Sequence, residues 1–205
     1  MSNKEPTGNN NLNIWEQVKE TDIRFTKESD FNGRRQTSIN GTYMVMKATE
    51  VFGPIGKGWG YEIIEERTDN GKVVMIDGEI QGHEVVHTIR LKLWYMQDGE
   101  RCSVEHFGHT PFITWSFKYK NFSTDMDAPK KSLTDAVKKC LSMLGFSADI
   151  FLGQFEDAEY IQEITEKSIA RHEDSKDEQI AARRKELSDW FKEQLELLKE
   201  IQKVG

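Results

Sequence analysis

Hydrophobic residues recur at every third or fourth position in three stretches of the chain, which predicts amphipathic helices. The longest helix is predicted from Pro129 to about Phe146. A second is predicted over residues 42–52, where Asn40 or Thr42 can cap the start and Gly53-Pro54 ends it. A short helix is predicted over residues 12–18. The apolar stripe of the longest helix consists of Leu133, Ala136, Val137, Cys140, Leu141 and Leu144.

Between the second and the longest helix, apolar and polar residues alternate, which is typical of half-buried strands. Asp69-Asn70-Gly71 is predicted to turn a first hairpin, and Asp98-Gly99 a second, because such pairs readily adopt positive φ. We therefore expect an antiparallel meander. Its five predicted strands cover residues 59–66, 72–76, 85–96, 101–107 and 113–119.

The predicted fold class is α+β, with an antiparallel β-meander packed against the long helix and a helical extension at the C-terminus. Residues 1–12 are polar and are predicted to form a disordered arm. Residues 13–155 form the predicted core domain. Residues 156–205 form an acidic tail with a hinge at 167–177 and a long helix at 180–204, whose apolar side suits a coiled coil or a partner equally well. The polar stretch 21–40 is predicted to be a loop.

The net charge of −7 argues at first against a nucleic-acid partner. Residues 156–205, however, hold 14 acidic and 9 basic residues, so the tail carries −5 and the rest of the chain only −2. A basic groove on the core is compatible with that balance. No apolar run approaches the roughly 18 residues that span a bilayer, the start lacks a secretory pattern, and Cys102 and Cys140 suit free thiols. We expect a cytoplasmic protein that does not bind membranes.

His83-Glu84-Val85-Val86-His87 matches the H-E-x-x-H pattern of zinc hydrolases. That chemistry needs a helix, because only a helix brings both histidines to one metal ion. The β-branched neighbours favour a strand, in which the histidines lie about 13 Å apart. A zinc-dependent hydrolase is therefore the alternative hypothesis. No nucleophile stands beside a recognisable base, so the sequence predicts a protein that is not an enzyme and needs no cofactor.

Basic residues gather in two places that suit a nucleic-acid backbone. The first is the long helix, with Lys130, Lys131, Lys138 and Lys139 outside its apolar stripe. By pattern alone these lysines also suit a solvated face, with Lys131 and Asp135 as an ion pair. The second is the stretch 21–40, where aromatic residues interleave the basic ones. An ordinary charged loop fits that stretch equally well. Its members are Arg24, Phe25, Lys27, Phe31, Arg34 and Arg35.

Three features together resemble a known family. They are the segment YMVMKATEVFGPIGKGWG at residues 43–60, the meander that follows, and APKKSLTDAVKKCLSMLGFSADIFLG at residues 128–153. In this order they resemble the Rad-fifty-two superfamily of single-strand annealing proteins. The segments NIWEQVKETD and GKGWGYEI are most similar to phage-encoded members. The resemblance covers residues 13–155.

The resemblance implies a β-β-β-α core that assembles into rings or helical filaments and anneals single-stranded DNA without ATP or metal. It thus implies a phage protein of homologous recombination and DNA repair in an infected bacterium. The family's paired bases fall on Lys138 and Lys139, and the preceding ones on Lys130 and Lys131, whereas Ser142 departs from a basic position. The basic residue on the N-terminal side of the groove falls on Lys27, with Arg34 and Arg35 as rivals. The acidic tail is expected to compete for the groove or to recruit a phage exonuclease or a host single-stranded DNA-binding protein.

Overall fold

The computed structural model describes residues 10–31 and 34–204, and its side-chain description leaves out residues 10, 31, 34, 35 and most residues beyond 173. The chain divides into two compact units. The core unit comprises residues 1–21 and 25–155, and the second unit comprises residues 22–24 and 156–205. Helices and strands are both present in the core, so the predicted α+β class is confirmed.

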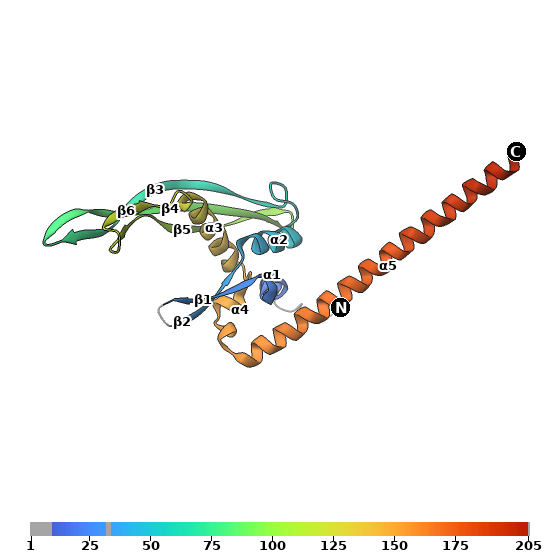
Figure 1. Cartoon of the computed structure of the whole chain (residues 1–205), viewed down its shortest axis with the longest axis horizontal. Coiled ribbons are helices and arrows are strands. Elements are labelled where there is room, and N and C mark those ends of the chain that lie inside the picture. Colours follow the sequence, from blue (N-terminus) through green and yellow to red (C-terminus); the bar gives the residue numbers. More distant parts are fainter. Residues whose placement is uncertain (1–9, 32–33, 205) are drawn as a thin grey trace, which may run out of the picture. The chain divides into compact units, whose positions relative to one another are not determined.

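The core is built on a curled antiparallel meander of four strands in the order β3-β4-β5-β6 (Figure 1). Asp98 and Gly99 form the turn between the second and third strands, with φ values of 52° and 85°. This turn confirms the prediction, because both residues occupy the left-handed region that a tight hairpin requires. The strands are β3 (Trp59–Ile76), β4 (Glu79–Gln97), β5 (Glu100–Ser116) and β6 (Asn121–Thr124).

The first hairpin turns at a different place from the predicted one. Asp77 and Gly78 form the turn, with φ values of 50° and 86°, and β3 runs unbroken through Asn70-Gly71. The pairing of β3 with β4 shifts between Asn70 and Val73, so the Asn-Gly pair sits at a bulge. A bulge and a turn both favour these residues, which is why the sequence misled the prediction. The two strands predicted within residues 101–119 are likewise the single strand β5 and the start of its turn.

The long helix α3 (Ala128–Met143) packs against β4 and β5 through its apolar stripe, as predicted. Ala136, Cys140 and Leu141 are completely buried. Gly108 of β5 allows the close approach, since a Cβ at this position would stand 2.1 Å from the carbonyl oxygen of Ser132. The helix is therefore held tightly to the sheet, and its remaining sides are free to carry polar residues.

Helix α2 (Gly41–Phe52) begins and ends where the sequence predicts. The Asn40 side chain accepts hydrogen bonds from the backbone N–H groups of Thr42 and Tyr43, at 2.8 and 3.4 Å. Gly53 ends the helix with a φ of 92°. The first turn of α2 meets α3 directly, because a Cβ on Gly41 would stand 2.7 Å from the Thr134 methyl group.

A hairpin replaces the loop that was predicted for residues 21–40. Strand β1 (Thr26–Phe31) pairs antiparallel with β2 (Arg34–Ile39), in a register that sets Phe31 opposite Arg34. The two intervening residues in the sequence are Asn32 and Gly33, a pair that favours hairpins, so a usable sequence pattern was present and was overlooked. Ahead of the hairpin lie η1 (Asn10–Leu12), α1 (Asn13–Val18) and η2 (Ile23–Phe25).

The core closes with α4 (Ala148–Phe151) and η3 (Gln154–Glu156). The buried Asp149 carboxylate accepts hydrogen bonds from the backbone N–H and the hydroxyl of Thr21, both at 2.6 Å. This contact joins the N-terminal segment to the end of the core across 128 residues of sequence.

The second unit is dominated by α5 (Ala158–Val204). The hinge predicted at residues 167–177 is wrong, because this stretch is part of the continuous helix. The apolar side chains that suggested a coiled coil, from Leu187 onward, lie outside the described residues. Within the described part of the chain, no helix combines the length and apolar character needed to cross a bilayer.

Candidate nucleic-acid interface

The four lysines of α3 fall into two classes. Lys131 forms an ion pair with Asp125, and Lys139 forms one with Asp135 at 3.0 Å. Lys130 and Lys138 form no ion pair with any described residue. Asp135 therefore pairs with Lys139 and not with Lys131, contrary to the pairing considered from the sequence. Two of the four ammonium groups are thus held by carboxylates, and two remain available to an anion.

Lys138 has the more unusual environment of the two unpaired lysines. Its side chain is half-buried, and its Cδ lies 3.7 Å from the position that a Cβ on Gly41 would occupy. Burial lowers the pKa of the Lys138 ammonium, and the negative charge of Asp135 opposes that shift in part. The charge is therefore poorly solvated and has no bonded carboxylate. A phosphate oxygen at this position would supply the missing counter-charge.

Beside these lysines lies an apolar pocket of about 280 Å³, which we call the α2–α3 groove. It opens between the first turn of α2, the outer side of α3 and the start of β3. Tyr61 is its most accessible aromatic residue, at 39% exposure. Thr134 lies in its wall, one helical turn from both Lys130 and Lys138. The lining residues are Gly41, Thr42, Val45, Ile55, Trp59, Tyr61, Leu133, Thr134 and Val137.

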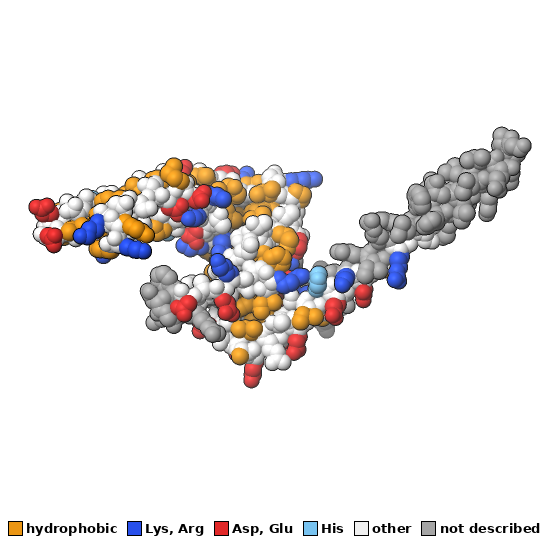
Figure 2. Space-filling view, viewed as in Figure 1, with side chains coloured by type: hydrophobic (Ala, Val, Ile, Leu, Met, Phe, Trp, Pro, Cys, Tyr) orange, Lys and Arg blue, Asp and Glu red, His pale blue; other side chains and the backbone are white. Residues whose placement is uncertain are grey.

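The face of the sheet that carries Arg67, Arg90 and Arg101 treats its cations differently. Arg67 pairs with Glu65 and Asp69, Arg90 with Glu105, and Arg101 with Glu62. Hydrogen bonds from Asp69 and Glu65 raise the pKa of the Arg67 guanidinium. We call this face the arginine face. In Figure 2, too, basic and acidic side chains are interspersed on the core and do not gather in one patch.

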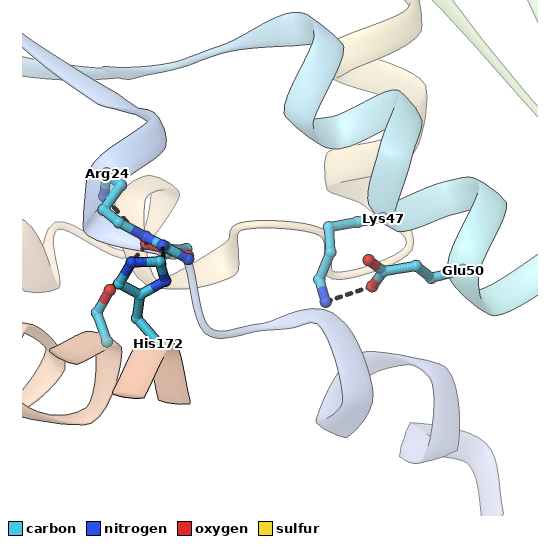
Figure 3. A network of polar contacts seen from close by, with 6 residues as sticks. Arg24, Lys47, Glu50 and His172 are labelled. Atoms are coloured by element: carbon cyan, nitrogen blue, oxygen red, sulfur yellow. Dashed lines mark hydrogen bonds and ion pairs between the residues drawn. The ribbon is translucent and has the colours of Figure 1, made fainter. Parts of the chain in front are cut away.

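The basic residues predicted on the N-terminal side of the groove are only partly placed. Lys27 is exposed on β1 and lies opposite Ser38, two residues before the cap of α2. Arg34 and Arg35 lie in β2, with side chains outside the described residues. Arg24 belongs to the second unit, where it pairs with Asp22 and lies 3.3 Å from the Nδ1 of His172 (Figure 3). The structure thus leaves Lys27 as the described candidate.

Ser142, where the sequence departs from the family's basic position, is half-buried. Its hydroxyl donates a hydrogen bond to the carbonyl oxygen of Lys139 at 2.9 Å. The hydroxyl therefore closes the last turn of α3 and is engaged within the helix.

The H-E-x-x-H motif lies in the middle of β4, as its β-branched residues predict. A strand separates His83 and His87 by about 13 Å, too far for both to hold one metal ion. Their neighbours are also engaged otherwise: the His87 Nε2 lies 3.1 Å from Glu66 Oε1, and Glu84 accepts the backbone N–H of Trp115 at 3.0 Å. Among the residues that the structure describes, no three His, Cys, Asp or Glu side chains are grouped to hold a metal.

Sequence reasoning missed the groove itself. Tyr61, Thr42 and Thr134 are far apart in the sequence and come together only through the packing of α2 on α3 and β3. The pairing of Lys131 with Asp125 was also missed, because Asp125 precedes the helix and lies outside its periodic pattern. Comparison with protein-family models and with curated proteins finds no match for the chain.

Proposed function

We propose that this protein binds single-stranded DNA through the α2–α3 groove and anneals complementary strands during homologous recombination. The observation that carries the proposal is the pair Lys130 and Lys138, which flank an apolar groove and lack carboxylate partners among the described residues. The resemblance of residues 13–155 to single-strand annealing proteins supplies the annealing activity, the phage origin and the assembly into rings or filaments.

The electrostatics of the groove suit a phosphate backbone. A phosphate at Lys138 would compensate an ammonium that is partly removed from water. Lys130 lies two helical turns away on the same helix, so two phosphates of one strand can be held along α3. Such contacts carry no sequence information, which suits a protein that must accept any complementary pair of strands.

Annealing would follow from holding a strand extended rather than from a chemical step. An extended strand loses less conformational entropy when it pairs, and several subunits acting together raise the effective concentration of weak contacts. The groove offers no nucleophile or metal site to this mechanism, and none is required. The acidic tail is proposed to compete with DNA for the groove or to recruit an exonuclease or a host single-stranded DNA-binding protein.

Annealing of two complementary oligonucleotides, one labelled with a donor and one with an acceptor fluorophore, tests the proposal. The protein should accelerate annealing in EDTA and without nucleotide, and binding should weaken steeply as salt rises. Electron micrographs with and without oligonucleotide test the assembly. A protein that binds no single-stranded DNA at low salt would refute the proposed function.

A further inference from the structure

The turn between β5 and β6 exposes two aromatic rings. Its sequence is Phe117-Lys118-Tyr119-Lys120, and Phe117 and Tyr119 are 71% and 69% exposed. Large aromatic side chains normally bury most of their surface, so two such rings within three residues need an explanation. We call residues 117–120 the aromatic–lysine turn.

The conformation of the turn is fixed by its own backbone. The N–H of Lys120 donates to the carbonyl oxygen of Ser116 at 2.8 Å, and the N–H of Tyr119 donates to the Ser116 hydroxyl at 3.3 Å. Lys120 adopts a φ of 52°, a left-handed conformation that is uncommon outside glycine. The turn thus presents its two rings from a defined backbone.

Three lysines surround the two rings. Lys72 of β3 places its ammonium 5.9 Å from the centre of the Phe117 ring, and Lys118 lies 5.1 Å from that of Tyr119. Together with Lys120, they form no ion pair with any described residue. Glu84 of the neighbouring strand directs a carboxylate oxygen at the backbone N–H of Trp115. The turn therefore combines accessible rings with uncompensated positive charge.

We propose that the aromatic–lysine turn binds single-stranded nucleic acid, with Phe117 and Tyr119 stacking on bases and the lysines neutralising phosphates. This inference rests on the proposed function and adds a base-contacting site to the phosphate contacts of α3. Alternating rings and cations match the alternation of bases and phosphates along a single strand. A membrane-binding surface, by contrast, separates a broad apolar face from a charged one.

The turn and the lysines of α3 belong to the same core unit. Only β6 and residues 125–127 separate the turn from the start of α3 in the sequence. Strand β6 is four residues long, which corresponds to about 13 Å. One strand of several nucleotides can therefore engage phosphates at α3 and bases at the turn.

Fluorescence anisotropy with two labelled 20-nucleotide probes of equal charge tests this proposal. One probe is oligo(dT), and the other has abasic sites throughout its central half. The wild-type protein should prefer oligo(dT), because only bases can stack. Phe117→Ala with Tyr119→Ala should bind oligo(dT) about tenfold more weakly and bind the abasic probe almost unchanged. The exchange Phe117→Tyr with Tyr119→Phe should retain the preference.

Phe151→Ala with Leu152→Ala is the matched control, since it also removes two exposed apolar side chains from the core unit and should bind both probes normally. Normal oligo(dT) binding by the Phe117/Tyr119 alanine variant, with weakened binding by Lys130→Ala/Lys138→Ala, would overturn the turn proposal and leave the proposed function standing. A wild-type protein that binds neither probe would overturn both. Loss of binding to phosphatidylserine vesicles with unchanged oligo(dT) binding would overturn the turn proposal in favour of a membrane contact.

Discussion

The α2–α3 groove and the arginine face both carry basic residues, but their electrostatics are opposite. On the arginine face, each of the three arginines lies against at least one carboxylate. In the groove, Lys130 and Lys138 have no such partner among the described residues. A phosphate must displace an existing carboxylate on the first surface and meets an unpaired cation on the second. The presence of a partner, more than the number of cations, therefore indicates where a backbone can bind.

The largest expected effect comes from disturbing the seat of α3 on the sheet. Gly108→Val should lower the free energy of unfolding by about 3 kcal/mol, the upper end of the range for overpacked sites, because its Cβ would collide with the Ser132 carbonyl oxygen. Urea denaturation followed by circular dichroism measures the change. Ser103→Val, at an exposed position of the same strand, should change stability by less than about 0.5 kcal/mol. Equal stability of both variants would contradict the close packing of α3 on β5.

The next effect compares the two classes of lysine directly. Lys130→Ala with Lys138→Ala should lower the salt dependence of single-stranded DNA binding by about 1.4, at about 0.7 per phosphate. That slope corresponds to about 25-fold weaker binding at 0.1 M salt. Lys131→Ala with Lys139→Ala should weaken binding by about fivefold or less, because these ammonium groups already have carboxylate partners.

Anisotropy titrations at four salt concentrations give both slopes in this lysine comparison. The two double variants lose the same charge from the same helix, so a general loss of positive charge would affect them equally. Equal slopes would show that the ion pairs do not matter and would remove the distinction between the two classes.

The elements that local pattern determines could be predicted from the sequence. Asn40 and Gly53 mark the ends of α2, and the spacing from Leu133 to Leu144 defines the buried side of α3. The turns were harder, because Asn70-Gly71 favours a bulge as well as a hairpin, and only pairing with β4 decides between them. The β1–β2 hairpin was missed because its strands are polar and lack the alternation that predicts burial.

The candidate site could be predicted only in part. The sequence shows four lysines on α3, but partners outside the helix decide which of them are available. Asp125 holds Lys131 from before the helix begins, and Gly41 of another helix shields Lys138. Such long-range contacts leave no periodic trace in the sequence, so the distinction between the two classes emerges only in the folded chain.

A smaller effect should follow from releasing the paired lysines. Asp125→Asn with Asp135→Asn removes both carboxylate charges and keeps an oxygen acceptor for the backbone N–H groups of Asp127 and His109. DNA binding should become several-fold tighter at 0.1 M salt, and the slope should steepen by about 1.4. Glu62→Gln with Glu105→Gln gives the same change in net charge on the arginine face and is the control. An equal gain in that control would place the arginine face on the DNA path.

The smallest effect is a difference in pH dependence between an unpaired and a paired lysine. Burial lowers the pKa of Lys138, so below that pKa the folded state carries the cost of a poorly solvated charge. Lys138→Met, which keeps an apolar side chain, should therefore be more stable than the wild type at pH 7. The advantage should shrink as pH rises through the lowered pKa and vanish above the ordinary value of about 10.5.

Lys131→Met should show the opposite sign. The hydrogen bond from Lys131 to Asp125 raises the pKa of the Lys131 ammonium, so the pair stabilises the folded state below pH 10.5, and that gain is lost as pH rises through the raised pKa. The variant should be less stable than the wild type at pH 7 and approach it in strong alkali. Urea unfolding of the three proteins between pH 7 and pH 10 measures both differences. Because the two lysines lie on one helix and titrate in the same range, differences of the same sign would mean that their environments are alike, and the electrostatic contrast between them would be lost.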